Sequence, residues 1–468
     1  MRLLLALVIQ WFCSQGFIQL GFFMSSIIQS ASQELIKPYQ SNITVPNWMI
    51  SSMERVMQYY VDKNLRLDTI STDRMPKPVE GKKYMLYAHI PFCHTLCSFC
   101  TFHRFLFRED KAREYFVALR KEMQMAKDLG YEFESMYIGG GTTTVLEDEL
   151  ARTIEHAKNL FPGIKEVSCE SDPQHLASPE FKQLKGLVDR MSIGVQSFDD
   201  GILKMTDRLD KFGSGQQTFD RIMAAKELFP IINVDLIFGF RGQTDEIIQS
   251  DLEMASKLDP RQITTYPLMI THQTRKSVKG QLAAPHGDMV NQYRQILNHL
   301  TGQYTQLSAW AFGKTNDEGF DEYVIDYDEY LGVGSGSFSF LNDTLYVNTF
   351  SLKKYQQRIA EGRMAVEQQK KYQLKEVMQY RFLLGMFSGR LSRKYFRDTF
   401  NVNLDTALFK EMTSMKAMGA LKNDPVNPDE LIVTDNGKML GLLMMKEFYS
   451  GMDNVRAQLR QPLGATDM

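Results

Sequence analysis

The residues with the clearest chemistry lie in one short stretch, from Tyr87 to Arg104, with the sequence YAHIPFCHTLCSFCTFHR. It places Cys93, Cys97 and Cys100 in a C-x3-C-x2-C pattern, directly after an apolar run that predicts a buried strand. Three cysteines just past a strand end can present three thiolates on one loop. Thiolates in such numbers hold zinc or an iron–sulfur cluster.

Three uses of these cysteines have to be compared. A structural zinc site usually takes four protein ligands, and because no second C-x2-C pair is present, the fourth would have to be a histidine such as His94 or His103. A disulfide would leave one of the three cysteines unpaired. Three thiolates on a four-iron cluster leave one iron open to another ligand, and the spacing favours this third interpretation.

The elements that must position this loop follow from an alternation of short apolar runs and amphipathic segments. Strand and helix in turn predict a parallel sheet with right-handed crossovers, which is an α/β fold. Ligands of such folds collect at the carboxyl ends of the strands, where the cysteine loop also lies. Strands are predicted at 84–90, 134–138, 166–170, 190–195, 233–238 and 263–269, and helices between them at 110–129, 147–160, 216–228 and 244–258.

Two glycine-rich segments also follow predicted strands or turns. Gly139–Thr142 comes after the second strand, and its three glycines would let the backbone approach a ligand closely. A phosphate-binding loop would continue with Gly-Lys and Ser or Thr, which is not the case. A second segment runs from Tyr330 to Phe338. For both segments the alternative is an ordinary turn.

For the charged residues at the strand ends, a ligand-binding role and a purely structural role both have to be considered. Glu170 ends the third strand, where it could accept hydrogen bonds from hydroxyl groups or could simply be a solvated charge. Arg208 could bind a carboxylate with its two-pronged guanidinium, or could form a surface ion pair with Asp207 or Asp210. Asp235 stands among apolar residues and needs partners if it is buried.

Taken together, the motifs resemble a known family. The cysteine pattern, with Phe99 before the last cysteine, is similar to that of the radical S-adenosylmethionine (SAM) superfamily. The strings HIPFC, GGGT, GVQSF, DLIFG and LGVGSG, spread from about Tyr84 to Phe340, resemble the oxygen-independent coproporphyrinogen III oxidase-like family. The resemblance implies a partial (β/α)6 barrel with a small α-rich, winged-helix-like C-terminal domain that would cover the active site.

The resemblance also implies the cofactors and the residues that hold them. Cys93, Cys97 and Cys100 would bind a [4Fe-4S] cluster, and an electron from it would cleave SAM to a 5′-deoxyadenosyl radical that abstracts a hydrogen from the substrate. The electron would come from a reducing donor protein. The residues implied as SAM contacts are Tyr87, Phe99, Gly140, Gly141, Thr142, Glu170, Gln196, Arg208, Asp235 and Phe338.

The expected substrate is a tetrapyrrole, either a porphyrinogen or haem. Coproporphyrinogen oxidases of the family have a fourth cysteine two residues after the third, and this chain has Phe102 there. Oxidative decarboxylation, two-SAM methylation as in anaerobic haem degradation, and haem trafficking without oxidase turnover therefore all stay open. His103 could bind haem or carry a proton, although a single histidine is more often structural.

Composition excludes some partners. With 54 Lys and Arg against 56 Asp and Glu, the net charge of -2 gives no basic excess for nucleic acid or an anionic membrane surface. Five cysteines, three of them within eight residues, favour a reducing compartment, so we expect a cytoplasmic protein. Residues 1–24 form an apolar extension, for which we favour an upstream start, with Met24 the real one, over a membrane anchor.

Prolines, glycines and changes of pattern suggest the domain boundaries. We expect an N-terminal helical and linker segment at 25–80, the barrel at 81–290 and a family-specific extension that closes the active site at 291–371. The C-terminal domain is expected at 372–455, with helices at 375–386 and 405–418, and a tail at 456–468.

Overall fold

The strand that leads into the cysteine loop, β2 (Tyr84–Ile90), lies in the interior of a large sheet and is buried except for the half-buried Tyr87. The computed structural model describes residues 39–69, 75–269, 283–314 and 327–460. The chain from Ser41 onward forms one compact unit.

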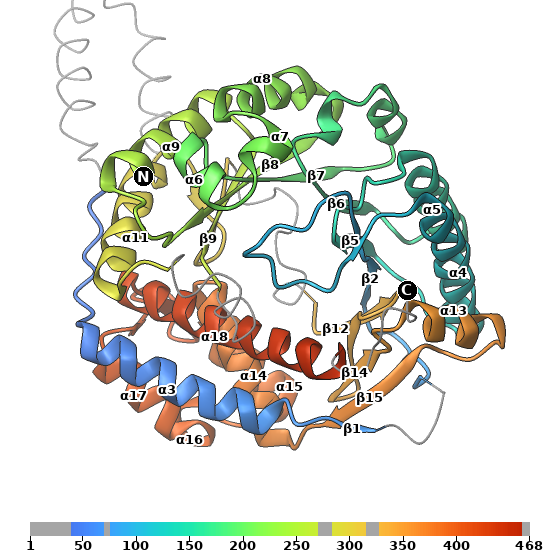
Figure 1. Ribbon diagram of the computed structural model, residues 1–468. Helices are drawn as coiled ribbons and strands as arrows, with labels where there is room; N and C mark the ends of the chain where they lie inside the picture. The colour runs from blue at the N-terminus through green and yellow to red at the C-terminus, as the bar shows by residue number, and fades with distance from the viewer. Residues whose placement is uncertain (1–38, 70–74, 270–282, 315–326, 461–468) are drawn as a thin grey trace, which may run out of the picture. The chain divides into compact units, whose positions relative to one another are not determined.

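The six predicted strands are confirmed and stand side by side in chain order, each parallel to the next. The helices between them follow the outside of this curved sheet (Figure 1). This is the predicted partial (β/α)6 barrel. After β2 the strands are β5 (Ser135–Gly140), β6 (Glu166–Ser171), β7 (Arg190–Gln196), β8 (Ile231–Phe238) and β9 (Gln262–Pro267), and the main helices are α4 (Glu109–Asp128), α5 (Glu147–Leu160), α8 (Gly215–Ala225) and α9 (Asp245–Leu258).

Local sequence explains why these elements form and end where they do. The strands are buried on both faces, which is why they read as nearly continuous apolar runs. Helix α8 begins with a capping box, in which Ser214 accepts from the backbone N–H of Gln217 and the Gln217 side chain accepts from the backbone N–H of Ser214. Helix α5 begins with three acidic residues, whose charge suits the positive end of the helix dipole.

The sheet extends beyond the predicted barrel on both sides, to thirteen strands in the described part of the chain. This extension was not predicted from the sequence, because its strands are short or, like β15, largely polar. Next to β2 lies β12 (Glu329–Val333), which is parallel to it, followed by the antiparallel strands β13 (Phe338–Leu341), β14 (Thr344–Asn348), β15 (Val366–Lys371) and β1 (Asp68–Thr69). The other edge carries β11 (Ala311–Gly313) and β10 (Thr305–Gln306).

The C-terminal region is mainly helical and contains a small antiparallel sheet, β16 (Arg390–Ser392), β18 (Glu430–Val433) and β17 (Leu421–Asn423). One predicted helix, 405–418, is in fact two, because the backbone at Leu408 leaves the helical region. The last helix, α18 (Asp435–Arg460), packs along α3 (Asn47–Asn64) and continues into the segment predicted as a tail. The other helices in this part are α11 (His286–Leu300), α13 (Leu352–Ala360), α14 (Leu374–Phe387), α15 (Arg393–Phe400), α16 (Leu404–Ala407) and α17 (Phe409–Ala417).

The apolar segment 1–24 lies outside the described residues, so the structure does not test its interpretation. Within the described ranges, none of the helices combines the length and the apolar character that crossing a membrane requires.

A buried carboxylate connects α4 to the second glycine-rich segment. Glu122 is fully buried and accepts hydrogen bonds from the Gly334 backbone N–H (2.7 Å), the Asn348 amide (3.0 Å) and the Tyr355 hydroxyl (2.8 Å). Burial nevertheless raises the pKa of Glu122 to about 7. The folded chain therefore holds this proton more tightly than the unfolded chain does.

This raised pKa predicts a pH dependence of stability. Since the folded state binds the extra proton, the free energy of unfolding should fall as the pH rises from about 4.5 to about 7 and then level off. Glu122→Gln should remove this contribution, which is at most about 3 kcal/mol. Denaturant unfolding on both sides of this window measures it, with the exposed Glu114→Gln on the same helix as the control. A stability difference between wild type and Glu122→Gln that does not change with pH would contradict the prediction.

Candidate functional site

The cysteine loop leaves β2 at its carboxyl end and folds back on itself. Its start, β3 (Phe92–Cys93), pairs with β4 (Phe105–Leu106), so the chain between the two strands forms a closed loop. Cys93 and Cys97 are buried, Cys100 is partly exposed, and none of the three forms a disulfide. Burial raises the pKa of the Cys93 thiol, and raises that of Cys100 to about 11.

Arg104 stabilises this loop through hydrogen bonds to its backbone. Its Nη2 donates to the backbone carbonyls of Cys97 (2.7 Å) and Cys100 (2.8 Å), which fixes two of the three cysteines relative to each other. Hydrogen bonds from a charged group are among the stronger ones in proteins. This role of Arg104 is not evident from the sequence, because it depends on how the loop folds back.

Two cations face the sulfur of Cys97. Arg208 Nη1 lies 3.8 Å and Lys211 Nζ 3.6 Å from the Cys97 Sγ atom, and Arg208 also donates to the Gly194 carbonyl. Arg208 is almost fully buried, and this burial lowers its pKa. The alternative of a surface ion pair is therefore wrong. Positive charge at this distance stabilises negative charge on sulfur.

The first glycine-rich segment lies directly against the start of the cysteine loop. The backbone N–H groups of Gly141 and Thr142 donate to the carbonyls of Ile90 (2.8 Å) and Phe92 (2.7 Å). Gly140 has a φ of 126°, and a side chain there would bring its Cβ to 2.8 Å from the Ile90 carbonyl. The Thr142 hydroxyl donates to Asp172 (3.0 Å). Glycine is thus required where two loops meet.

Several of the predicted polar residues lie on one face of the barrel sheet. Glu170 accepts from the Tyr137 hydroxyl (3.0 Å) and the Gly140 backbone N–H (3.1 Å), and the Tyr137 ring stacks on Tyr87 at 6.2 Å between centroids. Asp235 accepts from the Ser192 hydroxyl (2.8 Å) and from the Asn233 amide (2.7 Å). Strand register places these residues on the same face, since side chains alternate along each strand.

The three further candidates are Gln196, Phe99 and Phe338. Gln196 ends β7 at a β-bulge and has a φ of 74°, an uncommon conformation for a residue with a side chain and one that is concentrated at functional sites. Phe99 packs edge-on against Phe240 at 6.1 Å. Phe338 is buried at the start of β13.

His103 is fully buried, not poised at a surface. Its Nε2 pairs with the Ser335 hydroxyl (3.2 Å), and its ring stacks on His89 at 5.7 Å. Burial lowers the pKa of His103 well below its ordinary value, which makes this histidine neutral. These contacts tie the end of the cysteine loop to the second glycine-rich segment, a structural role.

Comparison with known proteins indicates the family. A model of the radical SAM superfamily matches residues 87–255. The chain is 27% identical to the heme chaperone HemW of Bacillus subtilis, over 76% of this chain and 96% of the relative. It is 25% identical to the oxygen-independent coproporphyrinogen III oxidase of Helicobacter pylori, over 83% of this chain and 90% of the relative. The fold matches coproporphyrinogen III oxidase HemN of Escherichia coli with a TM-score of 0.66 at 22% identity, covering 78% and 90% of the two chains.

The radical SAM domain, these relatives and the fold support the coproporphyrinogen III oxidase-like family of radical SAM proteins. Its cofactors are therefore a [4Fe-4S] cluster and SAM. The donor set fits them, because three thiols share one loop and Arg208 Nε is buried without a hydrogen-bond partner among the described residues. No group of His, Cys, Asp and Glu in those residues is arranged to hold a single metal ion. A four-iron cluster makes a different demand, since each cysteine binds its own iron.

The role of Arg104 leads to a prediction. Arg104→Ala should reduce the iron and sulfide bound per chain after anaerobic purification, because the loop loses two hydrogen bonds, each from a charged donor and worth about 1.5–3 kcal/mol. Arg104→Lys should retain part of the iron. The exposed Arg108→Ala is the matched control and should bind as much as wild type. Full iron content in Arg104→Ala would show that the loop does not need this clamp.

Proposed function

We propose that this chain is a radical SAM oxidoreductase that acts on a tetrapyrrole of the porphyrinogen or haem type. The observation that carries the proposal is the cysteine loop, with three thiols at the carboxyl end of a parallel strand and two cations at the sulfur of Cys97. The tetrapyrrole rests on the names of the relatives, a heme chaperone and coproporphyrinogen III oxidases.

In this proposal Cys93, Cys97 and Cys100 hold the cluster. When bound, the cluster supplies the electron that cleaves SAM to a radical able to take a hydrogen from the substrate. The chain's own residues bind and orient the cluster and SAM. Arg104 fixes the loop, and Arg208 offers its guanidinium to an anionic group beside Cys97.

The remaining predicted contacts of SAM have roles that their surroundings support. Gly140, Gly141 and Thr142 bring bare backbone to the cysteine loop, where the methionine end of SAM would lie. Glu170 presents a carboxylate for ribose hydroxyls. The other proposed SAM contacts are Tyr87, Phe99, Gln196, Asp235 and Phe338. In this proposal a reducing donor protein in the cytoplasm supplies the electron.

A second candidate function is haem binding without oxidase turnover. It is favoured by the relatives named heme chaperone and by Phe102, which stands where the oxidases of this family have a further cysteine. Phe102 is 46% exposed, and its ring lies 5.6 Å from the Arg456 guanidinium. Because a phenyl ring has no donor atom, Phe102 can contribute packing but no ligand to a metal.

The test is anaerobic turnover with SAM, a reductant and either coproporphyrinogen III or haem. We expect 5′-deoxyadenosine and a tetrapyrrole of changed mass, and a loss of both in Cys97→Ala. Cys169→Ala should retain activity, because that cysteine is buried beside Thr143 and is not one of the three on the loop. Stoichiometric haem uptake without product would support the carrier instead, and S-adenosylhomocysteine would indicate a methyltransferase.

A further inference from the structure

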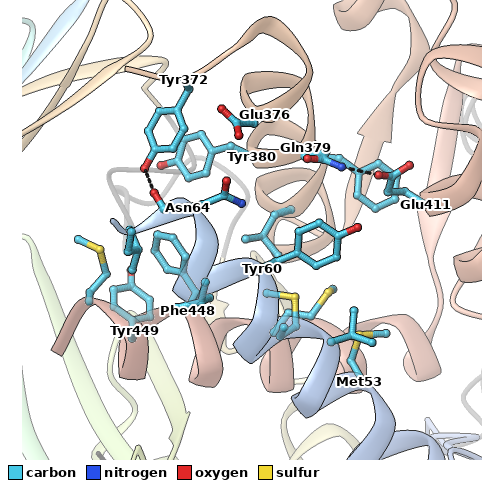
Figure 2. A pocket seen from close by; sticks show the side chains of 18 of the residues that line it. Met53, Tyr60, Asn64, Tyr372, Glu376, Gln379, Tyr380, Glu411, Phe448 and Tyr449 are labelled. Atoms are coloured by element: carbon cyan, nitrogen blue, oxygen red, sulfur yellow. Dashed lines mark hydrogen bonds between the residues drawn. The ribbon is translucent and has the colours of Figure 1, made fainter. Parts of the chain in front are cut away.

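A cavity of about 510 Å³ lies between α3 and the C-terminal helices α14, α17 and α18 (Figure 2). Of the residues assigned above to the cluster and SAM, only Phe338 lines it. The proposed function therefore leaves most of this cavity without a role. Its volume is in the range of cavities that bind small molecules.

The lining of the cavity extends along two helices. Helix α3 lines it with two residues from each of five successive turns, from Trp48 to Leu65, which at 1.5 Å per residue corresponds to about 25 Å. Helix α18 lines it from Met444 to Arg456, about 18 Å by the same rise. A volume of this size spread over such a length suits a chain-like ligand better than a broad ring.

The walls are apolar and adaptable. Rings of Tyr60, Tyr380 and Phe448 lie along the cavity in Figure 2. Methionine side chains are flexible and polarizable, so they fit ligands of varied shape. The methionines of the lining are Met49, Met53, Met57, Met415, Met418, Met444 and Met452.

The charges of the lining argue against a ligand with several carboxylates. The described lining residues include two cations, Lys410 and Arg456, and two carboxylates, Glu376 and Glu411. Glu376 lies 3.9 Å from Lys63, and Glu411 accepts from Gln379. Since these charges balance, a tetrapyrrole with four carboxylates would meet as much repulsion as attraction. A neutral ligand, or one with a single carboxylate, is compatible.

Helix α3 carries exposed apolar side chains along the cavity, and the most exposed of them is Trp48. Trp48, Val56 and Tyr60 line the cavity and are still 68%, 49% and 38% exposed. Tyr59, beside them on α3, is 67% exposed. Large exposed apolar side chains along an apolar cavity are suited to an apolar ligand entering from a lipid surface, where Trp and Tyr are favourable.

At the inner end the lining includes Arg456, which lies near the cysteine loop. The Arg456 guanidinium lies 5.4 Å from the ring centre of Phe338 and 5.6 Å from that of Phe102, two residues after Cys100. Arg456 also pairs with Asp453 on its own helix. A ligand that fills the cavity therefore ends beside the candidate site.

We propose that this cavity binds one long, unbranched hydrocarbon chain, as in a fatty acid or a fatty acyl compound. The chain enters at Trp48 and lies along α3, with its inner end near Arg456. This assignment goes beyond the proposed function, since binding of the chain requires neither SAM cleavage nor a tetrapyrrole.

The test is equilibrium binding of a fluorescent polyene fatty acid to the anaerobically purified protein, with displacement by saturated fatty acids of increasing length. We expect displacement to strengthen with chain length. Met53→Trp, which fills the middle of the cavity, should weaken binding by about tenfold or more. Met452→Trp, near the inner end, should shift the preference to shorter chains, and it serves as the second variant if Met53→Trp does not fold. Met223→Trp, partly exposed on α8, is the matched control and should bind as wild type.

Two outcomes would overturn the assignment. One is that no fatty acid binds. The other is that haem or coproporphyrin III binds instead and is blocked by Met53→Trp. SAM cleavage measured on the same samples separates the two proposals, because a chain can bind to a protein that does not cleave SAM, and the reverse also holds.

Discussion

The account depends on one constraint, which is that three thiols must be held on a short loop at the end of a buried strand. Arg104 meets it by donating to the carbonyls of Cys97 and Cys100, so the loop is fixed through its backbone and the sulfur atoms are left available. The loop ends are paired through β3 and β4. Arg208 and Lys211 then bring positive charge to Cys97.

The surrounding sheet positions the other groups relative to this loop. The parallel order of β2 and β5 brings Gly140 and Gly141 against the start of the cysteine loop, and Glu170 on β6 then reaches the Gly140 backbone N–H. On the other side of β2, the added strand β12 leads into the second glycine-rich segment, which Glu122 and His103 hold in place. Arg456 on the C-terminal helix α18 lines the cavity along α3 and also lies near Phe102 of the cysteine loop.

The barrel could be predicted because strands buried on both faces leave apolar runs that the sequence shows directly, as in β2 and β8. The strands β13 to β15 could not, because they are short and β15 reads VEQQKK, with no apolar alternation. The spacing of the cysteines predicts that they share one loop, and the resemblance predicts Arg208 as a SAM contact, an assignment that stays a prediction although Arg208 lies beside Cys97. The roles of Lys211 and Glu122 depend on contacts between distant parts of the chain, up to 233 positions apart for Glu122 with Tyr355, and no local signal carries them. Arg104 contacts carbonyls only four and seven positions away, but these contacts depend on how the loop folds back. The cavity likewise gathers residues from Trp48 to Arg456.

The most direct test of the central claim is Mössbauer spectroscopy and metal analysis of the protein purified without oxygen, before and after addition of SAM. The account predicts about four iron and four sulfide per chain, with SAM altering the signal of the one iron that no cysteine binds. Tightly bound zinc without iron, or a cluster whose spectrum SAM leaves unchanged, would contradict it.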